Sequence, residues 1–132
     1  MNIVVVDASA GVEMLARTST GVRTAELVPA GATMWVPDGV FDVEVLAVLR
    51  RWELNAVLNP QQIEASLHRL VTWRLRRASV TTVRERAWQL RKNLTFSDAC
   101  YVALAEALDA PLLTCDRKLV DAPNLATPTL HL

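Results

Sequence analysis

The sequence has 132 residues and no net charge, and 52% of its residues are hydrophobic, with a mean hydropathy of +0.21. This length suits one domain over residues 1–132 with a core of its own. No apolar run approaches the roughly 20 residues that cross a membrane, and the N-terminal run is too short for a secretory signal, so we expect a protein without a membrane anchor.

The expected elements alternate between strands and helices along the whole chain. In the first half we expect a strand over residues 3–6, helices over about 9–16 and 20–28, a strand over 33–36 and a helix over about 40–52. In the second half we expect a helix over about 60–73, a strand over 77–81, helices over about 83–92 and from residue 98, and strands over 112–115 and 127–130. This alternation predicts an α/β fold with a mainly parallel sheet of about five strands flanked by helices.

Two helix starts carry local signals. Asn59 followed by Pro60 is a favourable N-cap and first-turn pair. Thr82 and Glu85 have the spacing of a capping box, in which each side chain bonds to the backbone of the other residue. We therefore expect helices to begin at both places.

Two aspartates follow apolar strands. Asp7 comes directly after the first strand, and Asp116 comes directly after the strand over 112–115. Continuous apolar runs of this kind are typical of strands buried on both faces of a parallel sheet. Both acids are therefore expected just past the carboxyl ends of strands, where open α/β sheets place their ligand sites.

Two further acids are expected on helices that face the core. Glu44 has apolar neighbours three and four residues away on both sides, which indicates that it faces inward, whereas Asp42 lies roughly 200° around the same helix. Asp98 opens a later helix, with Tyr101 one turn further on. A carboxylate on an apolar face is costly unless something compensates its charge, and a hard cation does so.

Each acid also has a purely structural explanation. Asp7 and Asp116 have the position of helix N-caps, Asp98 that of an acid favoured by the helix dipole, and Glu44 could turn to solvent. The joint pattern favours a metal site. No His or Cys joins the four acids, so zinc is disfavoured and Mg²⁺, with Mn²⁺ as a substitute, is expected.

The charge is unevenly distributed although its sum is zero. Between Arg50 and Lys92 there are ten basic residues and three acids, whereas both flanking segments are acidic. A basic region beside an acidic metal pocket suits a phosphodiester backbone, although charged helix faces are also often simply solvated. The candidate residues for binding such a backbone are Arg50, Arg51, Arg76 and Arg77.

The remaining residue types point to packing and compartment. We expect both cysteines, Cys100 and Cys115, to be buried small hydrophobes in a reducing cytoplasm, because their spacing fits neither a metal site nor a disulfide framework. The four tryptophans are expected in the core or in a dimer interface rather than as base-stacking platforms. The high hydrophobic content likewise indicates an interface with another copy or a partner.

The four acids in this order and spacing resemble the PIN domain, and within it the VapC-type toxins of bacterial toxin–antitoxin pairs. The resemblance covers nearly the whole chain and rests on four segments. They are Val-Val-Asp7-Ala-Ser9, the stretch from Val36-Pro37 to Glu44 and its helix, Phe96-Ser-Asp98-Ala-Cys-Tyr101, and Pro111-Leu-Leu-Thr114-Cys-Asp116. One departure is Cys115, where the family more often has Ala.

This resemblance implies a PIN-like three-layer sandwich and a Mg²⁺-dependent endoribonuclease. Asp7 and Asp98 would be direct metal ligands, and Glu44 and Asp116 would complete the shell or orient the attacking water, with one or two ions left open. Ser9 and Thr114 match the small hydroxyl residues that flank the family's site. Family members are usually homodimers held inactive by an antitoxin whose tail blocks the acidic pocket.

Two alternatives stay open at this point. The chain could be a housekeeping RNA-processing nuclease without an antitoxin, or a PIN-like module that binds RNA or protein without cutting. Intact acids argue against the second alternative, because a retired site would be expected to lose them. A dehalogenase-type phosphatase is disfavoured, because it needs an aspartate where this chain has Ser9.

Overall fold

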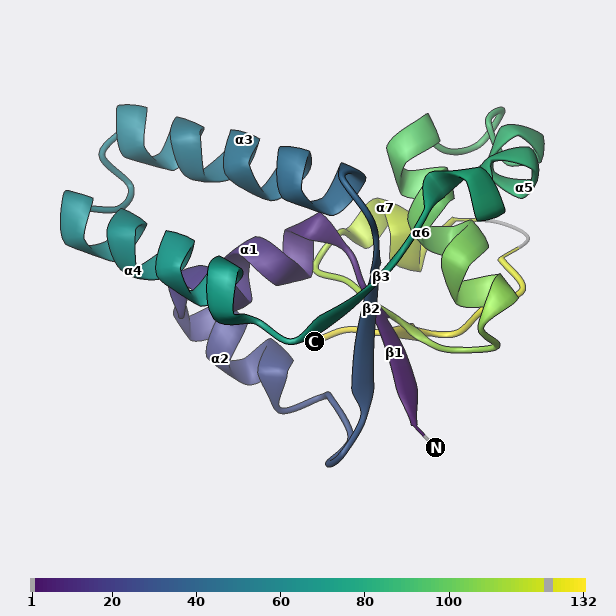
Figure 1. Ribbon diagram of the computed structural model, residues 1–132, viewed down its shortest axis with the longest axis horizontal. Coiled ribbons are helices and arrows are strands. Elements are labelled where there is room, and N and C mark those ends of the chain that lie inside the picture. The colour runs from purple at the N-terminus through teal and green to yellow at the C-terminus, as the bar shows by residue number, and fades with distance from the viewer. Residues whose placement is uncertain (1, 123–124) are drawn as a thin grey trace.

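One five-stranded sheet organises the molecule (Figure 1). The computed structural model describes residues 2–122 and 125–132. The strand order is β3-β2-β1-β4-β5, and every neighbouring pair is parallel. This confirms the predicted α/β fold with a mainly parallel sheet. The strands are β1 (Ile3–Val6), β2 (Thr33–Pro37), β3 (Leu75–Ala78), β4 (Leu112–Leu113) and β5 (Thr129–Leu130).

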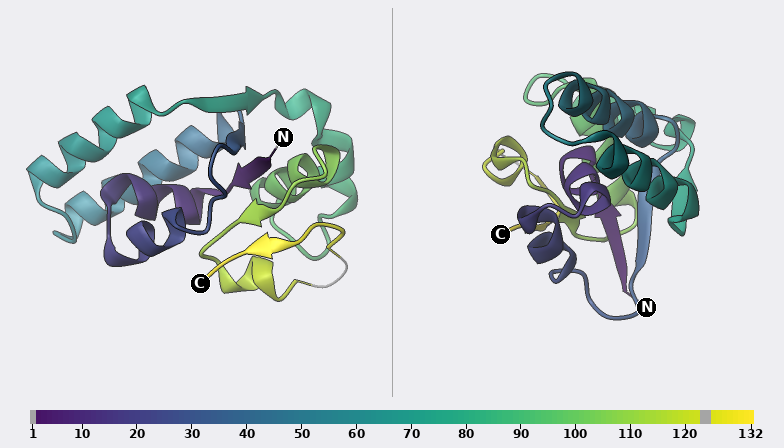
Figure 2. Two further views of the ribbon diagram at one scale, coloured as in Figure 1. Left: turned by 90° about the horizontal axis from the view of Figure 1, so that it is seen from below. Right: turned by 90° about the vertical axis from the view of Figure 1, so that its left-hand side faces the viewer.

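Helices cover both sides of this sheet. In Figures 1 and 2 the first four helices lie on one side of the strands, and α5 and α6 lie on the other. Within the described residues no helix is long and apolar enough to cross a membrane. The helices are α1 (Ala8–Ala16), α2 (Ser19–Ala25), α3 (Val40–Leu54), α4 (Pro60–Thr72), α5 (Arg84–Gln89), α6 (Phe96–Ala107) and α7 (Arg117–Val120), with a 3₁₀ turn at Val80–Thr82.

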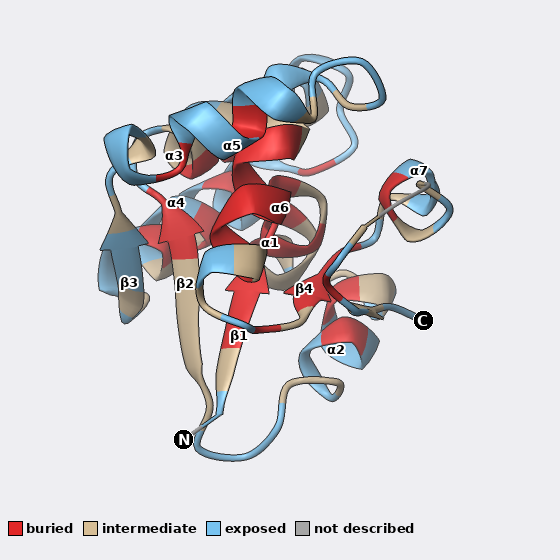
Figure 3. Cartoon of the chain, turned by 90° about the vertical axis from the view of Figure 1, so that its right-hand side faces the viewer, coloured by how far each residue is buried: buried red, intermediate tan, exposed pale blue. Residues whose placement is uncertain are grey.

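The core lies around β1 and α6. The side chains over 4–6 of β1 are completely buried, as expected for a central parallel strand covered on both faces. Helix α6 is buried over Ala99–Ala105 and contacts β1, β2 and β4. Figure 3 shows the contrast with β3, an edge strand whose middle residues are exposed. The most buried strands are therefore the ones that carry the acids at their ends.

Helix α3 reaches its place on α1 because α1 has a glycine at the contact. A Cβ atom on Gly11 would lie 2.5 Å from Cε1 of Phe41, the buried aromatic residue at the start of α3. The Phe41 ring also packs edge-to-face on Trp73, with ring centroids 5.9 Å apart. Gly39, with φ of 83°, makes the left-handed turn that begins α3. These contacts set the direction of the helix that carries Glu44.

The predicted capping box at Thr82 and Glu85 is wrong. The Thr82 hydroxyl donates instead to the carbonyl of Ser79, 2.6 Å away, within the 3₁₀ turn. Helix α5 begins after the buried Val83 without a side-chain cap and ends at Gln89, three residues earlier than expected. Asn59, in contrast, is the N-cap of α4 and Pro60 is its first residue, as predicted, and Asn59 also forms a capping box with Gln62.

Several element boundaries also differ from the expected ones. Strand β3 begins two residues and ends three residues earlier than predicted, because its ladder with β2 ends where Ala78 pairs with Pro37. Helix α2 ends at Ala25, and β4 and β5 have two residues each. The tryptophan prediction is confirmed for Trp35, Trp52 and Trp73, which pack on the core. Trp88 does not pack on the core of this chain, because it is 59% exposed and lies under Arg91; the alternative of a dimer interface stays a prediction.

Candidate active site

The four predicted acids line one pocket of about 320 Å³ at the carboxyl end of the sheet. Asp7 follows β1, Glu44 lies on α3, Asp98 lies in the first turn of α6, and Asp116 follows β4. Parallel strands end at the same edge of a sheet, which brings Asp7 and Asp116 together from opposite ends of the chain. The lining residues are Asp7, Ala8, Ser9, Glu44, Ala47, Val48, Arg51, Asp98, Tyr101 and Asp116.

Asp7 is the most buried of the four acids, with 3% of its surface exposed. Its Oδ1 accepts hydrogen bonds from the Ser9 hydroxyl at 2.7 Å and from the Ala10 backbone N–H at 2.9 Å, which makes it the N-cap of α1. Its Oδ2 accepts from the Thr114 hydroxyl at 2.5 Å. Asp7 is therefore both the cap of α1 and a residue of the pocket lining.

The two hydroxyl residues also hold the chain after β4. The Ser9 hydroxyl accepts from the backbone N–H of Cys115 at 2.9 Å, and the Thr114 hydroxyl accepts from that of Asp116 at 2.9 Å. Each hydroxyl thus has its one proton directed at Asp7 and an acceptor lone pair directed at the β4 segment. Ser9 and Thr114 lie beside the acids, where the family resemblance places them.

Burial dominates the electrostatics of Asp7. Loss of hydration raises the pKa of Asp7 to about 6, even though hydrogen bonds from Ala10, Thr114 and Ser9 favour the charged form. The nearby Asp98 carboxylate raises the pKa further. The site therefore holds a carboxylate whose charge is poorly compensated by the protein.

Asp98 has the same character in a more open position. Burial is the largest cause that raises the pKa of Asp98, and the carboxylates of Asp116 and Glu44 add to it. A hydrogen bond with Thr95 and the charge of Lys118 oppose this shift. Helix α6 begins at Phe96 with Thr95 as its N-cap, so Asp98 lies inside the first turn. The prediction that Asp98 opens the helix is therefore wrong.

Glu44 and Asp116 complete the acidic lining. Glu44 is half-buried, and its Oε1 accepts a hydrogen bond from the Tyr101 hydroxyl at 2.8 Å. Asp116 caps α7, a single turn of helix, by accepting from the backbone N–H of Lys118 at 2.9 Å. Asp42 lies outside this pocket, where it forms an ion pair with Arg77. The predicted orientation of Glu44 relative to Asp42 is confirmed.

The donor set of the pocket fits a hard divalent cation. All four acids supply oxygen ligands. Burial, and after it the neighbouring carboxylates, raises the pKa values of Asp7 and Asp98, and a cation would offset this cost of the charged forms. Among the described residues no three His, Cys, Asp or Glu side chains lie close enough together to hold an ion. Binding an ion would therefore require side chains at the pocket wall to rotate inward, and the bound cation would offset the repulsion between the carboxylates.

The four candidate RNA-binding arginines lie in different surroundings. Arg51 lines the pocket, one turn beyond Val48 on the same face of α3 as Glu44. Arg50 and Arg76 are exposed outside the pocket lining. Arg77 forms ion pairs with Asp38 and Asp42, so its charge is already engaged by two acids. The structure therefore separates Arg51 from the other three.

Tyr101 belongs to the pocket but was not among the predicted site residues. Tyr101 lines the pocket and bonds to Glu44, and its spacing three residues after Asp98 on one helix face was the available signal.

Cys100 is buried as predicted, but Cys115 is exposed. Strand β4 ends at Leu113, so Cys115 lies beyond the covered part of the sheet.

A second hollow lies away from the acids. It has a volume of about 410 Å³ and lies between α1, α2 and the end of α4, and its lining includes Met14, Val22 and Trp73 together with Arg17 and Arg69. It is larger and more apolar than the acidic pocket. The smaller pocket is the candidate active site, because it brings together titratable groups with raised pKa values.

Comparisons with known proteins identify the family of this chain. Residues 4–125 match the PIN domain family. Ribonuclease VapC12 of Mycobacterium tuberculosis is 34% identical over 120 residues, which cover 91% of this chain and 92% of that protein. Ribonuclease VapC3 of the same organism is 38% identical over 119 residues, which cover 90% of this chain and 86% of that protein.

Two solved structures share the fold. The M. tuberculosis toxin VapC20, described as cleaving the sarcin–ricin loop, superposes with a TM-score of 0.63 at 18% identity, over 86% of this chain and 89% of that one. VapBC2 from Rickettsia felis, bound to a DNA fragment from its promoter, also gives 0.63, at 17% identity over 96% and 98%. The family match and the two ribonuclease relatives establish the relationship: the chain belongs to the PIN domain family and, within it, to the VapC-type ribonuclease toxins.

Proposed function

We propose that this protein is a Mg²⁺-dependent endoribonuclease that acts as the toxin of a type II toxin–antitoxin pair. The observation that carries the proposal is the pocket in which four carboxylates from four separate elements surround one space. The family membership and the names of the ribonuclease relatives support the choice of RNA as the substrate.

The residues of the pocket have distinct roles in this proposal. Asp7 and Asp98 would hold the metal, and Glu44 and Asp116 would complete its shell or orient the attacking water. Bound Mg²⁺ would supply Lewis-acid stabilisation and lower the pKa of water. Ser9 and Thr114 orient Asp7 through their hydrogen bonds, and the guanidinium of Arg51 suits a phosphate of the RNA backbone beside the scissile bond.

Cleavage assays with matched variants test this function. The purified protein should cut single-stranded or looped RNA in Mg²⁺ or Mn²⁺ and lose activity in EDTA. Asp98→Asn should abolish cleavage. Asp42→Asn changes the same chemical group outside the pocket and should keep most of the activity. Cleavage that persists in EDTA would rule out the metal mechanism, and equal damage from Asp42→Asn and Glu44→Gln would mean that the wrong acid of α3 was chosen.

The proposed protein partners are an antitoxin and a second copy of the chain. A blocking antitoxin tail would need a basic group, because the pocket that it covers is lined by four acids. Helix α3 exposes Val43, Leu46 and Leu54, which would suit a homodimer contact. An adjacent small reading frame whose product inhibits cleavage would support the toxin role, and an active nuclease without such a neighbour would favour a housekeeping enzyme.

A further inference from the structure

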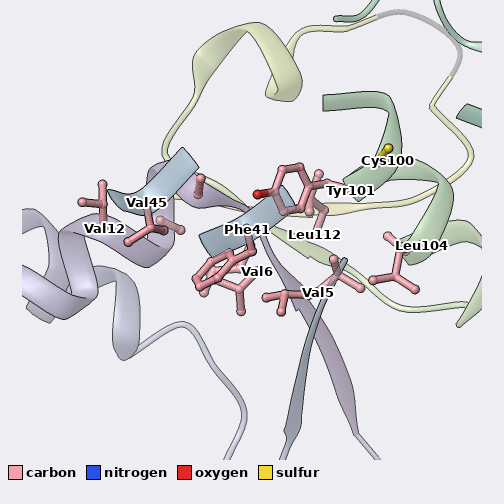
Figure 4. Packing of buried hydrophobic residues seen from close by; sticks show 14 of the residues in the cluster. Val5, Val6, Val12, Phe41, Val45, Cys100, Tyr101, Leu104 and Leu112 are labelled. Atoms are coloured by element: carbon pink, nitrogen blue, oxygen red, sulfur yellow. The ribbon is translucent and has the colours of Figure 1, made fainter. Parts of the chain in front are cut away.

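Tyr101 is a buried residue whose polar end reaches the acidic pocket. Its side chain is 1% exposed and packs among the apolar residues of the core. Figure 4 shows its ring near Leu112, with its hydroxyl oxygen directed toward the side of α3. The hydroxyl donates to Oε1 of Glu44 at 2.8 Å, a contact that joins α6 to α3 across 57 residues of sequence.

Glu44 lies at a position where a hydrogen-bond donor can restrict its side chain. It is half-buried at the rim of the pocket, and its neighbours Val43 and Leu46 on α3 are exposed. A glutamate at an open rim can distribute its carboxylate over several rotamers and reach water, and holding it in one rotamer costs conformational entropy. Asp7, in contrast, accepts three hydrogen bonds, from Ser9, Ala10 and Thr114. The Tyr101 hydroxyl is the corresponding support for Glu44.

The phenol is well suited to remain a donor. Burial raises the pKa of Tyr101, and the carboxylate of Glu44 raises it further through its charge and the hydrogen bond. The hydroxyl therefore keeps its proton, and the hydrogen bond to a carboxylate acceptor is of the stronger, charge-assisted kind.

We infer that Tyr101 is a positioning residue for the nuclease reaction. Its hydroxyl holds Oε1 of Glu44 and thereby fixes the direction in which this carboxylate meets a bound cation or the attacking water. The inference rests on the proposed function, because it assigns Tyr101 a role only through Glu44. Tyr101 itself would contact neither the RNA nor the metal.

Tyr101→Phe tests the inference by removing the hydroxyl while keeping the buried ring. Single-turnover cleavage should slow by about tenfold, because a hydrogen bond to a charged group is lost, while KM for RNA stays within about twofold. Mn²⁺ binding without RNA, followed by electron paramagnetic resonance, should also weaken. In a Glu44→Gln background, Tyr101→Phe should cause no further loss of rate or Mn²⁺ affinity, because its effect passes through the carboxylate.

A matched control separates positioning from general stability. Thr127 is buried and donates to the Ala110 carbonyl at 2.5 Å, before the amino ends of β4 and β5. Thr127→Val also removes a buried hydroxyl but should leave the cleavage rate and Mn²⁺ affinity unchanged. If Tyr101→Phe folds poorly, Glu44→Asp gives the same test from the other side, because the shorter side chain cannot reach the phenol while it keeps the charge.

The outcomes distinguish the inference from the proposed function. A wild-type protein that neither cleaves RNA nor binds Mn²⁺ overturns both. An active wild type with an equally active Tyr101→Phe variant overturns only the role of Tyr101. Equal losses from Tyr101→Phe in the wild-type and Glu44→Gln backgrounds show a structural effect and also overturn the role.

Discussion

The Thr114 hydroxyl donates to Oδ2 of Asp7 at 2.5 Å and accepts from the Asp116 backbone N–H at 2.9 Å. One side chain thus relates the positions of two acids that are more than 100 residues apart in sequence. The parallel pairing of β1 with β4 makes this contact available, because Val6 pairs with Leu113 and both strands end there. The placement of the acids therefore depends on strand register.

Asp7→Asn should change how stability depends on pH in EDTA. Burial raises the pKa of Asp7 from 3.8 to about 6, so between these values the folded protein binds a proton that the unfolded chain has released. The stability that Asp7 contributes is complete below the lower value and is lost as the pH rises through the higher one. An asparagine side chain does not titrate, so the variant does not lose stability in this way as the pH rises. Relative to wild type, its free energy of unfolding should rise by up to about 3 kcal/mol between about pH 4 and pH 7.5.

Urea unfolding at a series of pH values measures this difference. A difference between the two proteins that stays constant across the range would mean that Asp7 carries no penalty from burial. Asp98 also has a raised pKa, but its contribution is present in both proteins and largely cancels in the comparison.

Asp98→Asn should melt no lower than wild type in EDTA, although the variant is expected to be inactive. The ionised Asp98 is disfavoured by burial and by the nearby charges of Asp116 and Glu44, and the amide removes that repulsion. Mg²⁺ should stabilise the wild type by about 2.7 kcal/mol at about 100 times its Kd, and the variant much less. Calorimetry with and without Mg²⁺ measures both effects.

Thr95→Ala is the control for a capping role in α6. The Thr95 hydroxyl accepts from the Asp98 backbone N–H at 3.2 Å, and its loss should cost about 1 kcal/mol with or without metal. If Asp98→Asn is destabilised like Thr95→Ala and Mg²⁺ does not affect the wild type, Asp98 is a structural residue. The nuclease proposal would then lack one of its metal ligands.

Arg51→Gln should reduce the salt dependence of RNA binding. Each phosphate contact of a single strand contributes about 0.7 to the slope of log affinity against log salt, and Arg51 is the arginine that lines the pocket. Arg77→Gln should leave the slope nearly unchanged, because Asp38 and Asp42 already neutralise that charge. Binding of RNA to the Asp98→Asn protein, measured at several salt concentrations, avoids cleavage during the experiment.

Arg50→Gln provides the control on the same helix. Arg50 is exposed next to Arg51 but does not line the pocket. If Arg50→Gln lowers the slope as much as Arg51→Gln does, the RNA contacts are spread over α3 instead of concentrated at the acids.

Gly11→Ala should destabilise the fold by about 1–3 kcal/mol, as overpacking of a core usually does. The added Cβ would lie 2.5 Å from the Phe41 ring, which is completely buried and has little freedom to move. Gly21→Ala should cost more, because its Cβ would meet the backbone carbonyl oxygen of Glu13 at 1.9 Å. Thermal melting measures both variants. Phe41→Leu should recover part of the Gly11→Ala loss, and no recovery would place the strain elsewhere.

The elements that could be predicted from sequence are those with strong local signals. The apolar runs before Asp7 and Asp116 define β1 and β4, and Asn59 with Pro60 defines the start of α4. The prediction failed where a local signal had a competitor. Thr82 has the spacing of a capping box, but its hydroxyl is bonded to Ser79 in the preceding turn. The exposure of Cys115 also depends on where β4 stops pairing, which its sequence does not mark.

The sequence by itself determined the four acids, the oxygen-only donor set and the fold class, because hydrophobic periodicity reports which face of each element is buried. The tertiary structure decided how these residues meet. Strand register joins Asp7 to Thr114, and the contact between Gly11 and Phe41 directs α3. The position of each side chain in the folded protein decides that Arg51 lines the pocket, that Arg77 pairs with other acids, and that Tyr101 bonds to Glu44. Such contacts depend on distances between elements far apart in the chain, and no local pattern encodes those distances.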